Sequence, residues 1–348
     1  MPQRTDRTYA EISLSALRSN IRFYQTVCHK KIIAVCKDFA YGHGAVAPFL
    51  EPYVDAFAVA TAEEGVRLRL SGVEKPVLVL GYVPTSDLLT AVQNRLTLSL
   101  YDVRTAIIQN EFLAGKNALL PVHLKINTGM NRLGLSPSEL PLLVSMQNFR
   151  ITGIFSHYAV QKTTDELFYN RQTEAFLAAL SMGVSLGFPF EFIHLSNSGN
   201  ALFSPVGNAV RLGYGMYGYP SLTPAISWYA RVVQTRTLYP GESVGYDRTY
   251  RVIRPTRIAT LSVGYGDGFP RSLSGSGVLL HNGRALPIVG RICMDMMTAD
   301  VTDTDVATGD YLTLLGQSGA KRISPDDLGF GYEVLSGIAP RVPRYFID

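Results

Sequence analysis

Short apolar runs alternate with amphipathic stretches over roughly the first two-thirds of the chain. Runs of this kind, rich in Val, Ile and Leu and bounded by polar residues, are typical of buried strands in a parallel sheet. Eight occur, at residues 32–36, 56–60, 76–81, 96–100, 122–126, 151–155, 192–195 and 209–212. Helices are predicted between them, among them 62–70 and 165–186. This alternation favours an N-terminal (β/α)8 TIM-type barrel over a doubly wound sheet, which usually has fewer strands.

A first helix is predicted directly after Ser13, whose side chain can cap it. Leu14, Leu17, Ile21 and Tyr24 follow at spacings of three and four residues, which place them on one helical face. The helix therefore precedes the first barrel strand.

The pattern changes near residues 219–228, where prolines and small polar residues indicate a linker. Beyond it, β-like runs are separated by the turn pairs Pro240-Gly241, Asn282-Gly283 and Gly309-Asp310. These runs are 230–238, 246–253, 257–264, 277–280 and 311–315, and one short helix is predicted at 325–335. A strand followed by two methionines is predicted within 290–297. We expect the barrel over residues 1–222 and a C-terminal mostly-β domain over 223–348.

Composition narrows the class of protein. The chain has 348 residues, of which 47% are hydrophobic and 17% charged, so a large core is expected. The net charge of +4 is small and scattered, which argues against nucleic-acid binding. Three cysteines without a CxxC pair, and six histidines without HxxxH spacing, predict neither disulfides nor a metal site. The first seven residues lack a signal peptide's apolar stretch, and no segment could span a membrane, so a cytoplasmic protein is expected.

Lys37 follows the first predicted barrel strand and precedes a glycine-broken turn. A strand-end amine pointing into a site loses hydration, which lowers an amine's pKa and makes it a usable nucleophile or base. The alternative is a lysine that extends to solvent. Further polar residues also follow strands, where a barrel builds its active face: Arg132, His157, Asn197, Ser198 and Arg211.

Two other segments carry candidate chemistry. Ser198 and the pair Gly213-Tyr214 could offer hydroxyl and backbone N–H groups to a phosphate. In the β domain, three glycines at 264, 266 and 268 surround Tyr265 and could hold an exposed phenol on a tight turn. The alternative there is a β-turn with a packed aromatic ring.

Seven segments together resemble the alanine racemase family, in which they occur in the same order. They are Tyr-Gly-His-Gly after Lys37, Asn-Thr-Gly-Met-Asn-Arg-Leu-Gly, Phe-Ser-His, Asn-Ser, Val-Arg-Leu-Gly-Tyr-Gly-Met-Tyr-Gly, Gly-Tyr-Gly-Asp-Gly-Phe-Pro-Arg and Cys-Met-Asp. The resemblance implies a fold-type-III enzyme that interconverts L- and D-alanine with pyridoxal phosphate and supplies D-alanine for peptidoglycan.

The resemblance also implies two opposed bases. Lys37 is expected to form the Schiff base with pyridoxal phosphate and to act as one base, and Tyr265 from the partner subunit of a homodimer as the other. Racemisation needs this pair, because the α-proton leaves one face of the substrate and returns on the other. A phenol of ordinary pKa, about 10, is a poor base at neutral pH. The family supports it through His157 and Arg211.

The remaining roles follow from the same resemblance. Arg211 is expected at the cofactor's pyridine nitrogen, and its permanent charge keeps that nitrogen largely unprotonated. Arg132 is expected to bind the cofactor's phenolic oxygen and, with the Met294 N–H, the substrate carboxylate. Lys125, carbamylated in many members, is expected to orient Arg132. The other expected cofactor-binding and supporting residues are Tyr41, Asn197, Ser198, Gly213, Tyr214 and Asp295.

Three positions depart from the family pattern: Asn127 replaces a common aspartate, Phe39 a small residue and Pro340 a tyrosine. A pocket without that tyrosine could admit serine, because steric exclusion discriminates poorly against an added hydroxyl. Alanine remains the expected substrate, with a serine or broad-specificity racemase as the alternative. A pyridoxal-phosphate-dependent decarboxylase would carry a glycine-triplet phosphate loop, and a non-enzymatic pyridoxal-phosphate carrier would lack the second domain.

Overall fold

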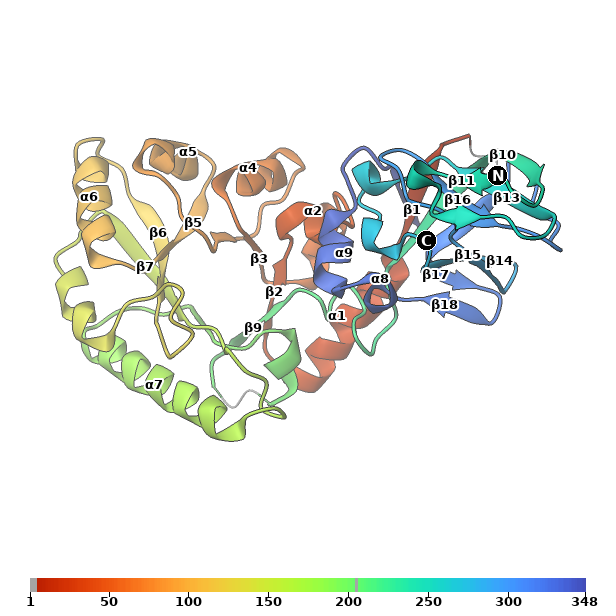
Figure 1. The fold of residues 1–348 in the computed structure, drawn as a ribbon. Helices are drawn as coiled ribbons and strands as arrows, with labels where there is room; N and C mark the ends of the chain where they lie inside the picture. The colour runs from red at the N-terminus through yellow and green to blue at the C-terminus, as the bar shows by residue number, and fades with distance from the viewer. Residues whose placement is uncertain (1–4, 204–205) are drawn as a thin grey trace. The chain divides into compact units, whose positions relative to one another are not determined.

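The structure is a computed structural model that describes residues 5–203 and 206–348, so residues 1–4 of the N-terminal segment lie outside it (Figure 1). The chain forms two compact units. Unit 1 contains Met1–Ala16, of which residues 5–16 are described, together with Tyr41–Gly44 and Pro224–Asp348. Unit 2 contains Leu17–Ala40 and Ala45–Thr223. In the described part of the chain, no helix is long and apolar enough to cross a membrane.

Unit 2 is built around a closed barrel of eight parallel strands, which confirms the predicted (β/α)8 barrel. The strands neighbour one another in chain order, and β2 closes the ring by pairing with β9. They are β2 (Lys31–Val35), β3 (Ala56–Val59), β4 (Val77–Val79), β5 (Leu96–Leu100), β6 (Leu120–Lys125), β7 (Phe149–Phe155), β8 (Phe192–His194) and β9 (Ala209–Leu212). Their residues are almost all buried, as expected for strands covered on both faces.

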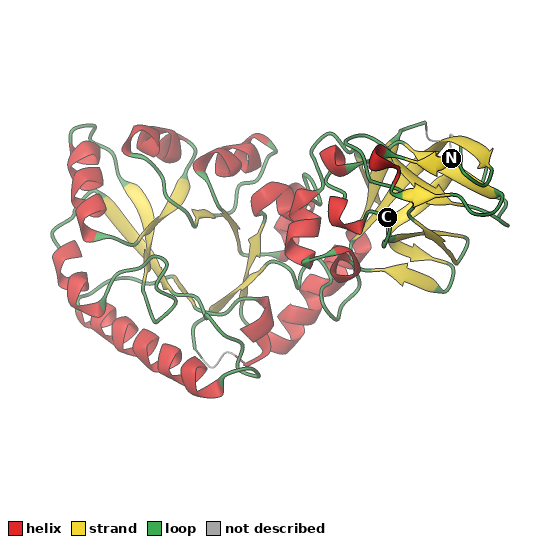
Figure 2. Ribbon diagram, in the orientation of Figure 1, coloured by secondary structure: helices red, strands yellow, loops and turns green. Residues whose placement is uncertain are grey.

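Helices lie around the ring of strands (Figure 2). They are α1 (Leu14–Cys28), α3 (Ala47–Leu50), α4 (Ala62–Leu70), α5 (Leu88–Gln93), α6 (Val103–Ala114) and α7 (Glu166–Ser185). Side-chain caps order the starts of α1, α4, α6 and α7; for example, the Ala16 N–H donates to Ser13 Oγ over 3.1 Å, and the Phe168 N–H to Asp165 Oδ1 over 3.0 Å. The predicted cap at Ser13 and the predicted helix at 62–70 are both confirmed.

A left-handed turn follows Lys37 directly. In α2 (Lys37–Tyr41), Asp38, Phe39 and Ala40 have φ of 51°, 52° and 54° with ψ near 50°, and Tyr41 has φ of 50°. A left-handed backbone costs an L-residue roughly 1–2 kcal/mol. The sequence predicted a turn broken by glycine, but the structure turns left-handed over four non-glycine residues before Gly42. Strain of this kind persists where surrounding structure enforces it, often at functional sites.

Unit 1 is mostly β, as predicted. Its main path of strands runs in the order β15-β14-β17-β10-β1-β19. These are β15 (Arg284–Pro287), β14 (Val278–His281), β17 (Tyr311–Ser318), β10 (Ile226–Leu238), β1 (Thr8–Ser13) and β19 (Arg344–Ile347). Off this path lie β13 (Thr256–Leu261), β16 (Met297–Asp300) and β18 (Lys321–Ile323), while β11 (Ser243–Val244) pairs with β12 (Tyr250–Arg251). The fully buried Trp228 anchors the core and donates from Nε1 to Thr8 Oγ1 over 2.8 Å.

Three predictions for the β domain were wrong in part. Residues 290–296 form no strand, because this segment turns through Gly290, with φ of 73°, before β16 begins. Only Tyr250–Arg251 of the run 246–253 is a strand, since Asp247 and Arg248 have positive φ. The helix predicted at 325–335 is two helices, α8 (Pro325–Leu328) and α9 (Gly331–Gly337), separated at Gly329 by its φ of 154°.

Candidate active site

The barrel brings several predicted site residues to one end of unit 2, where the carboxyl ends of its parallel strands lie. They are Lys37 after β2, Lys125 at the end of β6, His157 after β7, Asn197 and Ser198 after β8, and Arg211. Arg211 lies within β9, the strand predicted at 209–212. The polar groups of this face therefore come from strands β2, β6, β7, β8 and β9.

Arg211 is the buried centre of this face. Its side chain donates through Nη1 to His194 Nδ1 over 2.7 Å and through Nη2 to His157 Nδ1 over 2.9 Å. Nη2 also donates to the carbonyl oxygen of Ser156 over 2.8 Å. Burial and the nearby Arg132 lower the pKa of Arg211 to about 9, so the guanidinium stays charged at neutral pH. Its position is thus set by acceptors from two neighbouring strands and the loops that follow them.

A chain of imidazoles extends from Arg211 into the barrel. His194 Nε2 lies 3.0 Å from Nδ1 of His123, in β6. Burial, and after it the Arg211 charge, lowers the pKa of His157 and of His123 to about 3, and the pKa of His194 well below its ordinary value. All three rings are neutral at neutral pH. His123 and His194 were not predicted as site residues, although an ionisable residue inside an apolar barrel strand was a usable signal.

Lys125 is packed beside this cluster. Its side chain is buried, and its Nζ lies 5.7 Å from the centroid of the Phe155 ring, whose face also lies 5.5 Å from Arg211 Cζ. Burial, with the Arg132 and Arg211 charges, lowers the pKa of Lys125 to about 8. Among the described residues, no carboxylate lies within ion-pair distance of this amine. The surroundings of Lys125 therefore favour a neutral or negatively charged group.

Ser198 and the glycines after β9 form a small polar cradle. Ser198 Oγ accepts from the N–H groups of Gly213, over 3.0 Å, and Gly215, over 3.3 Å. A Cβ on Gly215 would lie 2.2 Å from Tyr24 Oη, so only glycine fits there. Nearby in sequence, Ser196 Oγ is buried without a hydrogen-bond partner among the described residues. Backbone N–H and hydroxyl groups gathered in this way suit a phosphate.

Asn197 and Tyr214 flank the cradle. The Asn197 Oδ1 atom accepts from the Asn200 N–H over 3.1 Å and so caps the short 3-10 helix that begins at Ser198. The Tyr214 ring stacks on Tyr219 with centroids 5.0 Å apart. Both side chains therefore shape the cradle that Ser198 and the glycines form.

The exposed Arg132 lies on a turn ordered by Asn127. Asn127 Oδ1 accepts from the N–H groups of Gly129, over 3.1 Å, and Asn131, over 3.0 Å. Its Nδ2 donates to Asn131 Oδ1 over 2.9 Å. An amide can both accept and donate here, whereas a carboxylate could only accept. The Asn127 side chain therefore makes three hydrogen bonds within the turn that carries Arg132.

Unit 1 gathers the remaining predicted residues. Tyr265, 41% exposed, lies on a 3-10 turn, and its N–H donates to the Cys293 carbonyl over 3.1 Å. The next N–H, of Gly266, donates to the carbonyl of the exposed Met294 over 2.8 Å. Asp295 follows and pairs with Arg341. The turns of Tyr265 and Met294 are thus hydrogen-bonded to each other.

Tyr41 also belongs to unit 1, where its ring centroid lies 6.1 Å from that of Tyr332. Lys37, Lys125, Arg132, His157, Asn197, Ser198, Arg211, Gly213 and Tyr214 belong to unit 2. Each unit therefore carries part of the predicted set.

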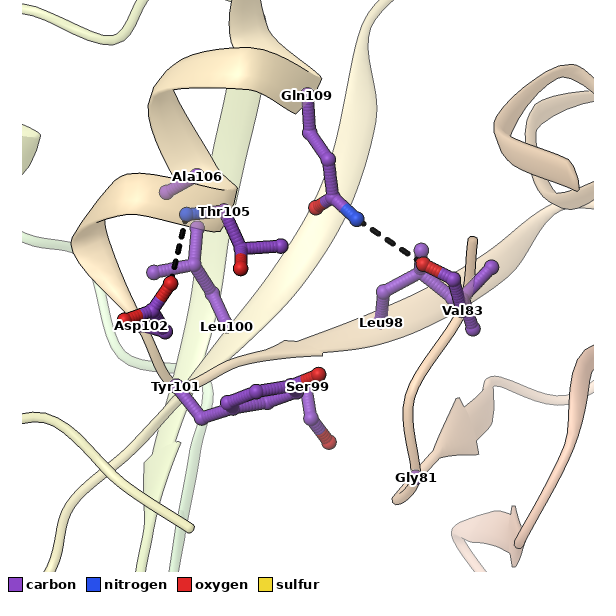
Figure 3. A pocket seen from close by; sticks show the side chains of 10 residues that line it. All are labelled: Gly81, Val83, Leu98, Ser99, Leu100, Tyr101, Asp102, Thr105, Ala106 and Gln109. Atoms are coloured by element: carbon purple, nitrogen blue, oxygen red, sulfur yellow. Dashed lines mark hydrogen bonds between the residues drawn. The ribbon is translucent and has the colours of Figure 1, made fainter. Parts of the chain in front are cut away.

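A small cavity inside unit 2 lies apart from these residues. Its walls include Ser99, Tyr101 and Asp102 of the β5 end and Gln109 of α6 (Figure 3). The Gln109 amide donates to the Val83 carbonyl over 3.1 Å, and the Thr105 N–H to Asp102 Oδ2 over 2.7 Å. The volume of about 10 Å³ accommodates about one water molecule, too little for a cofactor. Within residues 5–203 and 206–348, no group of three or more His, Cys, Asp or Glu side chains could hold a metal ion.

Comparison with known proteins identifies the family. Residues 12–221 match the family model for the alanine racemase N-terminal domain, and residues 225–346 match that for the alanine racemase C-terminal domain. An alanine racemase of Halothermothrix orenii is 36% identical over 369 aligned residues, which cover 98% of this chain and 97% of that protein.

Solved structures agree. Alanine racemase from Bacillus anthracis with bound L-Ala-P superposes with a TM-score of 0.93 at 30% identity, covering 99% of this chain and 96% of that one. Alanine racemase from Bartonella henselae with covalently bound pyridoxal phosphate gives a TM-score of 0.86 at 30% identity, covering 99% and 100%. Both family models match, and a relative aligns over nearly its full length. The chain therefore belongs to the alanine racemase family of pyridoxal-phosphate-dependent isomerases.

Proposed function

We propose that this protein interconverts L-alanine and D-alanine with pyridoxal phosphate, and supplies D-alanine for peptidoglycan as a cytoplasmic homodimer. The observation that carries the proposal is the buried Arg211, held between His157 and His194 on the barrel face that also bears Lys37. The names of the relatives give the substrate, because a barrel alone implies no particular chemistry.

The donor set of unit 2 fits the cofactor. The cradle of Ser198, Gly213 and Gly215 suits its phosphate, and the buried unpartnered Ser196 hydroxyl adds a polar group close by in sequence. Arg211 supplies a permanent cation for the pyridine nitrogen, and Lys37 an amine for the aldehyde. When bound, pyridoxal phosphate withdraws electron density from the substrate's α-carbon and makes its proton acidic.

The chain's own residues then move one proton. Lys37 takes or returns it on one face of the α-carbon, and Tyr265 does so on the other. In the homodimer each active site combines Lys37 of one subunit with Tyr265 of the other. Arg132 and the Met294 N–H hold the substrate carboxylate, which fixes the α-carbon between the two bases. The backbone hydrogen bonds between the Tyr265 turn and the Met294 turn support this arrangement.

Arg211 and His157 tune this chemistry. Because Arg211 keeps its protons, it would donate a hydrogen bond to the cofactor's ring nitrogen without protonating it, and would so restrain side reactions such as transamination. The neutral His157 accepts from Arg211 through Nδ1, so its Nε2 carries a proton that it can donate to the Tyr265 phenolate. A hydrogen bond to the charged form makes a phenolate easier to form.

Isotope exchange tests the proposal. The holoenzyme is incubated with L-alanine in deuterated water, and chirality and α-deuterium are measured together. We expect D-alanine to form with deuterium at the α-carbon. Retention of the α-proton together with unchanged chirality would remove the racemase assignment. A Lys37→Ala variant is the control, and we expect it to do neither.

Serine is the second candidate substrate, because the exposed Pro340 stands where many family members carry a tyrosine. We expect a higher kcat/KM for alanine than for serine. We expect Pro340→Tyr to widen that preference, since the added ring narrows the space for a hydroxymethyl group, an effect of about 10-fold for a small steric difference. A higher kcat/KM for serine in the wild-type enzyme would reverse the substrate assignment.

A further inference from the structure

One carboxylate lies at the centre of the turn that carries Tyr265. Asp267 is completely buried, two residues after Tyr265. Its Oδ2 accepts from the Gly264 N–H over 3.0 Å and from Arg7 Nη1 over 3.1 Å. Its Oδ1 accepts from Arg341 Nε over 2.8 Å and from the second Arg7 nitrogen. Four donors from three separate segments of unit 1 therefore meet on one side chain.

The charge of Asp267 is maintained by these donors. Burial alone would raise the pKa of the Asp267 carboxyl, but the hydrogen bonds from Arg7 and the Gly264 N–H outweigh burial and hold that pKa below its ordinary value. Arg7 and Arg341 are both partly exposed, so each reaches inward from the surface to the buried oxygen atoms. A buried carboxylate with two arginine partners is costly to disturb, because removing it leaves both cations uncompensated.

The backbone around Asp267 is closely packed against neighbouring segments. A Cβ on Gly264 would lie 2.2 Å from the Cys293 carbonyl oxygen, and one on Gly268 would lie 1.9 Å from that of Gly337. Gly268 also has φ of 99°, which favours glycine. The Asp267 carbonyl accepts from the Ala339 N–H over 2.9 Å. The glycines thus allow close backbone packing, and Asp267 supplies the polar contacts that hold it.

Arg341 extends the network to the substrate-binding turn. While its Nε binds Asp267, its Nη2 donates to Asp295 Oδ1 over 2.7 Å. Asp295 directly follows Met294, whose carbonyl accepts from the Gly266 N–H. One arginine therefore joins the turn of the second base to the turn that supplies the carboxylate donor.

We propose that Asp267, through Arg7 and Arg341, is the positioning residue that fixes the Tyr265 phenol relative to the Met294 N–H. This inference rests on the proposed racemase function and goes beyond it, because Asp267 does not itself touch substrate or cofactor. Its consequence is selective. Loss of Asp267 harms proton transfer on the Tyr265 face of the substrate and spares transfer on the Lys37 face.

The test separates exchange from inversion. Each alanine enantiomer is incubated with holoenzyme in deuterated water, and α-deuterium and chirality are followed. A Tyr265→Phe variant identifies the enantiomer whose α-proton faces Lys37, because only Lys37 can then exchange it. For Asp267→Asn we expect racemisation to fall about 100-fold, the loss typical of a misplaced catalytic group. We expect exchange of the Lys37-facing enantiomer to stay within a few-fold of wild type.

A second variant keeps the test valid should Asp267→Asn fold poorly. Arg341→Gln leaves the Arg7–Asp267 pair in place, and Arg341 is partly exposed, so we expect it to fold. We expect racemisation by Arg341→Gln to fall about 10-fold, a smaller loss than for Asp267→Asn. Exchange of the Lys37-facing enantiomer should again stay within a few-fold of wild type. The matched control is Asp300→Asn in β16, whose carboxylate accepts from the Thr302 N–H and hydroxyl instead of an arginine. We expect its exchange-to-inversion ratio to equal that of wild type.

Three outcomes decide the matter. Selective loss of inversion, with the Tyr265 turn displaced from the Met294 turn in a crystal structure of the Asp267→Asn variant, supports the proposal. A parallel fall of exchange and inversion for both enantiomers, tracking a lowered Tm, overturns it and makes Asp267 a stability residue only. Absence of both exchange and inversion in the wild-type enzyme overturns the proposed function itself, and this inference with it.

Discussion

The Nδ1 atom of His194 lies 2.7 Å from Nη1 of Arg211, and this contact fixes the protonation of a whole imidazole chain. Arginine only donates, so His194 Nδ1 accepts and its Nε2 carries the proton. That proton points to His123 Nδ1, 3.0 Å away, which must therefore accept as well. Two histidines are thus held in the same neutral tautomer by a single buried cation.

Stability should fall in mild acid because these rings are held neutral. Above their ordinary pKa of about 6.5, folded and unfolded states bind the same number of protons. Below it, the unfolded chain protonates while the buried rings do not, down to a pKa of about 3 for His123 and His157. We expect each such histidine to lower the free energy of unfolding by about 1.4 kcal/mol per pH unit in this window.

Urea denaturation between about pH 4 and pH 6, below the ordinary histidine pKa, measures this slope. The variant His123→Gln keeps an acceptor for His194 but removes one titrating ring, so its slope should be smaller by about 1.4 kcal/mol per pH unit. The control is Val122→Ala at the neighbouring buried position of β6, which removes no titrating group and should leave the slope unchanged. Equal slopes in wild type and His123→Gln would mean that His123 titrates normally in the folded protein.

Mixing two inactive variants should restore activity. In the proposed homodimer, a Lys37→Ala subunit still offers Tyr265, and a Tyr265→Phe subunit still offers Lys37. Each mixed dimer then contains one intact and one doubly altered site. Co-expression with two different tags should recover up to roughly a quarter of wild-type activity, because about half of the dimers are mixed and half of their sites intact. Activity no higher than that of either variant alone would place both bases on one chain.

Lys125 should carry a carbamate. Its pKa of about 8 leaves a fraction of the amine neutral near neutral pH, and only a neutral amine adds CO₂. The carbamate is an anion, and it replaces the ammonium cation of Lys125 near Arg132 and Arg211. Native mass spectrometry in bicarbonate buffer should show the added mass of one CO₂ in wild type and in the surface control Lys116→Ala, and its absence in Lys125→Ala. An unmodified wild-type mass at alkaline pH would contradict the prediction.

The left-handed turn predicts an unusual order of substitutions at the 44% exposed Phe39. At φ of 52°, a β-branched valine is strained, whereas asparagine tolerates this conformation. We expect the free energy of unfolding of Phe39→Val to be about 1 kcal/mol lower than that of Phe39→Asn. At the similarly exposed Phe23 in α1, the same pair should differ little, because Val and Asn have similar helix propensity. Chemical denaturation of the four variants measures both differences.

Periodicity predicted the barrel well because each strand is a local feature of the sequence. The bounds of β5 and β9 were confirmed residue for residue, and those of β2 and β6 within two residues. Residues 38–41 were different, since Asp-Phe-Ala-Tyr contains no glycine and nothing local indicates a left-handed backbone. Long-range packing, not propensity, decides that conformation.

The polar networks were the least predictable part of the site. Arg7 and Asp267 are 260 positions apart, and β1 joins β19 from the opposite end of the chain. Such pairings depend on the complete fold, so no local pattern reports them. His194 could have been found, because its place in a buried strand requires a partner. Arg211, the partner of His194, was predicted for roles toward the cofactor and Tyr265, and not for this contact with His194.

The turn after Lys37 also matters for chemical synthesis. Its backbone has the handedness that D-amino acids adopt without strain. A semisynthetic chain with a D-residue at the exposed position 39 should therefore fold at least as well as the natural one. We propose that this protein makes D-alanine. A D-amino acid would itself suit the backbone of the turn beside Lys37 better than the L-phenylalanine at position 39 does.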